Sequence, residues 1–129
     1  MTEEFVTLET AKLLKEKGFK EDVFTFYEVD CVEGDMILSE TYDESENFNE
    51  KNDCLSAPTQ SLAQKWLRET KNIHICVYNC ACGYGYEISK ADNGTHITSS
   101  VYERTNDGEE WDIYEEALEA GLQEALKLI

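Results

Sequence analysis

The sequence predicts an α+β fold, in which antiparallel strands form a sheet and helices pack on one face of it. Two observations predict this class. Apolar residues recur at helical spacing in three segments, and short runs of β-branched and aromatic residues lie between clusters of Gly, Asn and Asp. The expected order of elements is α-β-β-loop-α-β-β-β-α. With 129 residues, we expect a single domain over 1–129.

The first helix is expected to begin after Thr7, whose hydroxyl can accept a hydrogen bond from a backbone N–H of the first turn. Ala11 and Leu14 belong to its apolar stripe. Gly18 follows the last turn, where a left-handed residue commonly ends a helix. Phe19 can then fold back onto Leu14, so both side chains are predicted to lie in the core.

A hairpin and a loop are expected next. Val23 to Val29 combines β-branched and aromatic residues and predicts a strand, and Met36 to Glu40 is its predicted partner after a turn at Glu33–Asp35. Residues 41–55 are acidic and rich in Asn, and they show no hydrophobic periodicity. We therefore expect a mobile acidic loop over 41–55.

The second half is expected to contain a helix followed by three strands. Ser56–Pro58 is predicted to open the helix, because Pro is tolerated in a first turn. The strands are predicted at Ile73–Tyr78, Tyr84–Ser89 and Thr95–Tyr102, with a turn at Asn79–Gly83 between the first two.

The last helix is expected to follow a turn at Asn106–Gly108 that ends the sheet. Asp112-x-x-Glu115 has the form of a capping box. Leu118 and Leu122 belong to an amphipathic stripe. Gly121 lies inside this helix, where Gly costs about 1 kcal/mol relative to Ala, so we expect a packing reason for it.

Negative charge is concentrated in two blocks of a chain whose formal net charge is −17. Residues 21–56 contain twelve acids and one base, and residues 103–119 contain eight acids and one base. This balance argues against direct DNA binding and against attachment to anionic membranes, which both need clustered Lys and Arg. It favours instead a protein partner with a basic surface. The carboxylates expected to bind this partner are Asp43, Glu44, Glu46, Glu50 and Asp53.

No catalytic or cofactor motif stands out, so we expect a non-enzymatic accessory protein that needs no cofactor. An alternative is a small zinc- or thiol-dependent protein, because Cys76, Cys80 and Cys82 lie near His74 and His96. All three cysteines and His74 would share one face of an unbroken strand. The Cys-x3-Cys-x-Cys spacing differs from the Cys-x2-Cys spacing of structural zinc sites, and a hairpin with ordinary thiols explains it as well.

A third alternative is a degenerate module related to double-stranded-RNA-binding domains. Residues 58–129 have the predicted order α-β-β-β-α, which resembles those domains in topology and length. The only plausible basic patch for binding RNA consists of Lys65, Arg68 and Lys71. The start of the last helix is acidic at Glu115 and Glu116, where those domains are basic, so RNA binding by that surface is not expected.

The chain is expected to be cytoplasmic. Met1 is followed by Thr2, Glu3 and Glu4, without the basic and apolar regions of a secretory signal. Five cysteines are an odd number without the spacing of a disulfide framework, so reduced thiols are the simpler interpretation.

Two stretches carry a family resemblance. They read APTQSLAQKWLRE over 57–69, followed by His74–Ile75, and YEEALEAGL over 114–122. Both resemble a group of small uncharacterised proteins of gut bacteria and their phages or prophages. The resemblance covers the second helix, the start of the next strand and the last helix. It implies a bacterial cytoplasmic setting associated with mobile elements, and it transfers no catalytic residue.

Overall fold

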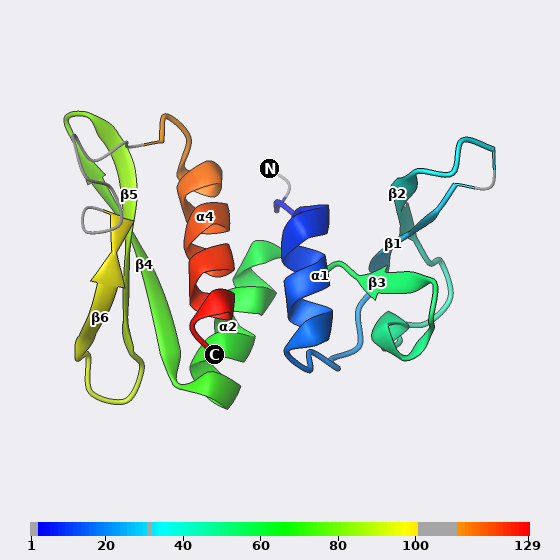
Figure 1. Cartoon of the computed structure of the whole chain (residues 1–129), viewed down its shortest axis with the longest axis horizontal. Helices are drawn as coiled ribbons and strands as arrows, with labels where there is room; N and C mark the ends of the chain where they lie inside the picture. Colours follow the sequence, from blue (N-terminus) through cyan, green and yellow to red (C-terminus); the bar gives the residue numbers. More distant parts are fainter. Residues whose placement is uncertain (1–2, 31, 101–110) are drawn as a thin grey trace. The chain divides into compact units, whose positions relative to one another are not determined.

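The computed structural model describes residues 3–30, 32–100 and 111–129 (Figure 1). The chain divides into two compact units, Met1–Ser61 and Leu62–Ile129. The α+β class is confirmed, with the strands in two three-stranded antiparallel sheets. The single-domain organisation over 1–129 stays a prediction.

The first unit begins with helix α1 (Leu8–Glu16), as expected. Thr7 is its N-cap, and its hydroxyl accepts a hydrogen bond from the backbone N–H three residues later at 3.4 Å. Gly18 has a φ of 92°, a conformation that Gly adopts without the steric cost that other residues meet. Phe19 N donates to Leu14 O at 2.9 Å, and both side chains are buried. The capping residues therefore set both ends of α1.

The sheet of the first unit has β1 (Thr25–Val29) at its centre. It pairs antiparallel with β2 (Met36–Glu40) on one side and with β3 (Cys54–Ser56) on the other (Figure 1). β2 has the predicted bounds. β1 begins two residues later than predicted, and Val23 instead forms an isolated backbone bridge with Glu46.

The expectation of a continuous loop over 41–55 is wrong, because this segment contains a 3-10 helix, η1 (Phe48–Glu50), and the start of β3. Phe48 is buried and its ring stacks on the ring of Phe26, with the centroids 4.1 Å apart. One aromatic anchor thus holds a segment whose other residues are mostly polar. The mobility of the segment stays a prediction.

Asn49, also in η1, holds the segment through two side-chain hydrogen bonds. Its side-chain amide donates to Phe19 O, and its Oδ1 accepts from Ser56 N, each at 2.9 Å. These two bonds connect η1 to the chain after α1 and to β3. Since each satisfies a backbone group, loss of Asn49 would leave two partly buried polar groups without their partner.

The second helix, α2 (Gln60–Lys71), does not open at Ser56–Pro58 as predicted. Ser56 is the last residue of β3, and Pro58 O accepts a hydrogen bond from Val6 N at 3.0 Å. These backbone bonds keep the chain extended, and the helix therefore begins two residues after Pro58.

The sheet of the second unit is a three-stranded antiparallel meander. Its strands are β4 (Ile73–Cys80), β5 (Gly83–Lys90) and β6 (His96–Ser99), and β5 is central. The turn between β4 and β5 occupies residues 81–82, so the predicted turn at Asn79–Gly83 was too long. The predicted third strand, Thr95–Tyr102, is observed over His96–Ser99. Its predicted last residues, 101–102, lie outside the described residues, as does the predicted turn at 106–108.

The outer edge of β4 is partly occupied. Ala91 N donates to Asn72 O at 3.0 Å, so Asn72 and Ala91 form a hydrogen-bonded pair. Hydrogen-bonded and non-bonded pairs alternate along an antiparallel ladder. Ile75 therefore belongs to a non-bonded pair, and its backbone N–H and C=O point away from β5. The side-chain amide of Gln64 donates to this outward Ile75 O at 3.1 Å. An edge carbonyl of β4 is therefore already satisfied by α2.

Helix α4 (Tyr114–Lys127) packs against β4 and β5 (Figure 1). Gly121 faces the sheet, and a Cβ at this position would lie 2.9 Å from Ile75 Cγ2 and 3.2 Å from Tyr86 Cγ. Leu122 is fully buried nearby. The predicted packing reason for Gly121 is thus close approach of the helix to the sheet.

The predicted capping box of the last helix is wrong. Ile113 is the N-cap, with φ −120° and ψ 132°, and it makes no side-chain capping hydrogen bond. Asp112 lies one residue too early to cap, while Glu115 and Glu116 remain in the first turn, where they complement the helix dipole. In the part of the chain that the structure describes, none of the helices combines the length and the apolar character that a bilayer crossing demands.

Candidate functional site

The five predicted partner-binding carboxylates all belong to the first unit, around β2, η1 and β3. Asp43 and Glu44 follow β2, Glu50 ends η1, and Asp53 precedes β3; these four residues are exposed. Glu46 is half-buried. The structure thus places the set on one acidic segment that wraps from the end of β2 to the start of β3.

Glu46 differs from the other four carboxylates because it is held at both its backbone and its side chain. Its backbone N and O bond with Val23 O and N, each at 3.0 Å. Its Oε1 lies 3.1 Å from Lys51 Nζ. The hydrogen bond with Glu46 and the charge of Glu46 raise the pKa of Lys51, which therefore stays cationic. Glu46 thus has a structural role in this segment, and its binding to a partner stays a prediction.

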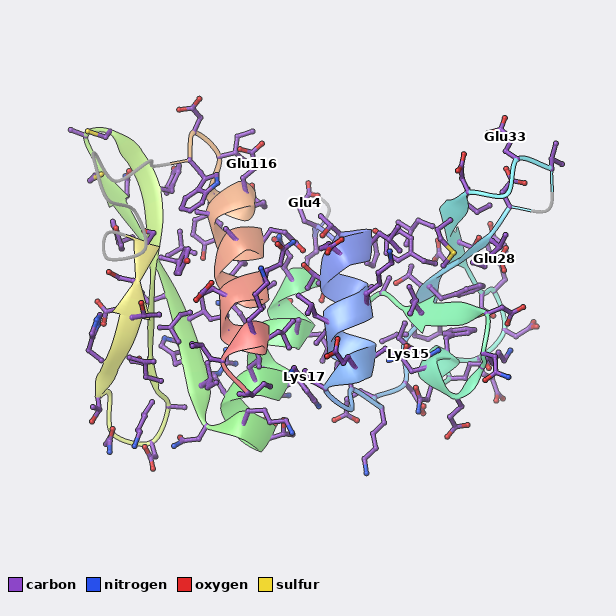
Figure 2. All side chains as sticks on the ribbon, viewed as in Figure 1. Glu4, Lys15, Lys17, Glu28, Glu33 and Glu116 are labelled. Carbon is purple, nitrogen blue, oxygen red and sulfur yellow. The ribbon has the colours of Figure 1, made fainter. Side chains whose placement is uncertain are left out.

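Lys15 of α1 fixes the turn that carries Asp53. Its Nζ donates to Lys51 O at 2.9 Å and to Cys54 O at 3.0 Å, and Figure 2 shows its side chain reaching from α1. A cation thus satisfies two carbonyls of the turn. The exposed carboxylates therefore project from a backbone that α1, β1 and η1 hold in place.

Further carboxylates line the β1–β2 hairpin. Figure 2 shows Glu33 near the hairpin tip and Glu28 on β1. Ser39 of β2 donates its hydroxyl to Glu28 Oε1 at 3.0 Å. Glu40, the last residue of β2, is exposed. The acidic character of residues 21–56 is therefore spread along the hairpin as well as along the segment after it.

A depression of mixed polar and apolar lining beside these acids is a feature that sequence reasoning missed. It has a volume of about 460 Å³ and is lined by Phe5, Thr25, Leu38, Ser39, Glu40 and Tyr42. Leu38 is 46% exposed and Tyr42 is 93% exposed. The sequence signal was the unbroken apolar run Met36–Leu38, because a strand with one buried face would alternate apolar and polar residues.

The predicted zinc or thiol residues lie in the second unit. Cys76 and Cys80 are exposed on β4, Cys82 is exposed in the turn after it, and His74 shares the face of Cys76. His96 of β6 lies in the pairing register of this face, with Nδ1 3.8 Å from Oε1 of Glu87. Within residues 3–30, 32–100 and 111–129, no three His, Cys, Asp or Glu side chains are grouped to hold a metal ion. The thiol and zinc alternatives stay predictions.

Cys54 is a buried thiol in the acidic segment, unlike the exposed thiols of β4. Burial, with a further contribution from Asp53, raises the pKa of Cys54 above its ordinary value of 9.0. Because the thiolate is the reactive form, we expect iodoacetamide at pH 8 to modify Cys76, Cys80 and Cys82 at least about tenfold faster than Cys54. Peptide mapping by mass spectrometry measures each rate separately.

Protein unfolded in urea is the control for this experiment, since there the four thiols should react at similar rates. Equal rates in the native protein would mean that the turn before β3 opens freely, contrary to the anchoring by Lys15 and Asn49 described above.

The predicted basic patch for RNA lies on α2, where Lys65, Arg68 and Lys71 are exposed. Lys71 Nζ lies 5.5 Å from the ring centroid of Trp66. Among the residues that the structure describes, the order α2-β4-β5-β6-α4 matches the predicted α-β-β-β-α order. The first turn of α4 remains acidic, so its electrostatics are still opposite to those expected for a phosphate-binding surface.

No family model matches this chain, and no curated protein or solved structure matches it. The candidate site therefore rests on the geometry of the first unit alone.

Proposed function

We propose that this protein is a non-enzymatic accessory protein that binds a partner protein with a basic surface through its acidic first unit. The observation that carries the proposal is the depression beside β2, where the exposed apolar side chains of Phe5, Leu38 and Tyr42 lie next to carboxylates. Exposed apolar side chains that gather beside polar groups are typical of a protein interaction site. A rim of one charge sign adds selection of the partner and speeds its encounter.

The charge distribution within the first unit supports this proposal. Four of its five bases are Lys12, Lys15, Lys17 and Lys20, which belong to α1 or the turn after it. Residues 21–56 contain Lys51 as their single base, and it is engaged by Glu46. The exposed acids Asp43, Glu44 and Glu50 lie in this region, so most bases of the first unit lie in or just after α1, while the acids dominate its sheet region.

The test is affinity capture from a bacterial lysate by the immobilised protein, with quantitative mass spectrometry. The variant Asp43→Asn/Glu44→Gln/Glu50→Gln removes three exposed charges without changing side-chain size. We expect a partner that is retained in about 50 mM salt, released near 300 mM salt and depleted about tenfold by this variant, because salt screens exposed charges. The control variant removes three exposed acids elsewhere, as Glu9→Gln/Glu16→Gln/Glu69→Gln.

Two outcomes would contradict the proposal. Failure to retain any protein in low salt would rule out an electrostatic partner. Equal depletion by the two triple variants would mean that net charge alone matters and that the acidic segment is not a binding surface.

A further inference from the structure

β2 lies at the edge of the sheet in the first unit, and its pairing with β1 shows which backbone groups it leaves at the open edge. Thr41 N donates to Phe24 O at one end of the pairing, at 2.8 Å. Asp30 N donates to Asp35 O at the other end, at 2.6 Å. Bonded pairs alternate along an antiparallel ladder. Every second residue of β2 therefore directs its N–H and C=O away from β1, and these residues are Met36, Leu38 and Glu40.

Side chains also alternate between the two faces of a strand, so those of Met36, Leu38 and Glu40 share one face of the sheet. The depression lies on this face. Leu38 and Glu40 both line it, with Phe5 and Tyr42 nearby. Side chains of directly paired residues point to the same face of a sheet. A strand added at β2 would therefore direct the side chain opposite Leu38 toward the depression, and the side chain two residues away would lie beside the Glu40 carboxylate.

The charges at this edge select among possible occupants. Glu40 is exposed on the strand, Asp43 and Glu44 follow it, and Glu33 lies near the hairpin tip. A second copy of the chain would bring an identical acidic edge, and repulsion between the two sets of carboxylates disfavours that pairing. A segment with Lys or Arg two residues from an apolar side chain matches both the Glu40 carboxylate and the apolar side chains that Leu38 and Tyr42 contribute to the depression.

We propose that β2 binds an extended segment of a partner protein by strand addition, with an apolar side chain over the depression and a Lys or Arg two residues away beside Glu40. Main-chain hydrogen bonds supply affinity in this binding mode, and the alternate side chains supply specificity. The inference rests on the proposed function and names the chemistry of the partner segment and the place where it binds.

The probe is the peptide acetyl-Ser-Lys-Val-Leu-Val-Lys-Ser-amide, whose Lys residues flank the Leu symmetrically and so suit both strand directions. Binding is followed through the backbone amide signals of the whole chain by nuclear magnetic resonance. We expect shifts concentrated in Met36–Glu40 and near Phe5 and Tyr42, which disappear in 0.5 M salt. A peptide with Glu in place of both Lys residues should not bind.

Two variants separate backbone pairing from charge. Leu38→Pro removes an N–H that points away from β1, which an edge strand tolerates, and it should abolish binding, whereas Leu38→Ala keeps that N–H and should weaken binding less. Glu40→Lys should weaken binding of the Lys peptide at least about tenfold and create binding of the Glu peptide. This exchange of preference keeps the proposal testable even if Leu38→Pro does not fold.

Four outcomes would overturn the proposal. The Lys peptide could bind equally to the Glu40→Lys variant, or it could shift amides away from β2. The free protein could show concentration-dependent shifts at Met36–Glu40, which would identify a second copy as the occupant. The lysate partner could be retained by Leu38→Pro yet lost by the triple acidic variant, in which case the proposed function would stand and strand addition would not.

Discussion

Phe48→Ala is expected to lower the free energy of unfolding of the first unit by about 3 kcal/mol, which is typical for removal of a buried aromatic ring. Phe48 is 3% exposed and stacks on Phe26 at a centroid distance of 4.1 Å. The other anchors of this segment are hydrogen bonds of Asn49, Glu46 and Lys15, so Phe48 supplies its large buried apolar contact. Loss of the ring should therefore free the segment before it unfolds the whole chain.

Hydrogen exchange measured by mass spectrometry is the suitable readout, because both Trp residues, Trp66 and Trp111, lie in the second unit and do not report on the first. The control is Phe24→Ala, since Phe24 is 53% exposed and its truncation should cost less than about 1 kcal/mol. Unchanged exchange over 41–56 in Phe48→Ala would show that the segment is not anchored by this ring.

Gly121→Ala is expected to destabilise the second unit by about 2 kcal/mol, although Ala is the better helix former. The added Cβ would lie 2.9 Å from Ile75 Cγ2 and 3.2 Å from Tyr86 Cγ. Neither atom is the far end of a flexible side chain, so α4 itself must move away from β4 and β5. Gly121→Val should be more destabilising. Urea unfolding followed by Trp fluorescence measures both effects.

Ala120→Gly is the matched control, because it makes the reverse exchange at a half-buried neighbouring position of α4. It should cost about 1 kcal/mol through helix propensity alone. If propensity governed this helix, Gly121→Ala would instead stabilise the protein by a similar amount. A stabilised Gly121→Ala variant would therefore disprove close packing of α4 on the sheet.

Local signals predicted most of the regular elements. Thr7 and Gly18 mark the two ends of α1 through their own side-chain and backbone chemistry, and the structure places them there. β2 matches its predicted bounds because its apolar run ends in the Asp35 turn on one side and in polar residues on the other. Such signals depend on residues close in sequence, and they need no knowledge of the partner strands.

The predictions were wrong where contacts between residues distant in the sequence determine the local structure. Phe48 and Asn49 lie in a polar segment without periodicity, yet contacts with Phe26 and Phe19 order them. Ser56 looked like part of a helix start, and pairing with β1 made it a strand residue. The run Met36–Leu38 indicated an exposed apolar side chain on β2, but the contribution of Phe5 to the depression could not be predicted, since Phe5 is far from Leu38 in the sequence. Tertiary contacts of this kind leave no pattern in a single sequence.

The Gln64 side chain that occupies Ile75 O has a consequence for aggregation. Growth of a fibril requires successive strands to add at free edges, and exposed edges are the usual starting points. Addition at β4 would have to displace an existing hydrogen bond and leave an amide unsatisfied. The Gln64 hydrogen bond therefore makes strand addition at this position of β4 less favourable, and it does so without the added charge that many edge strands use for the same purpose.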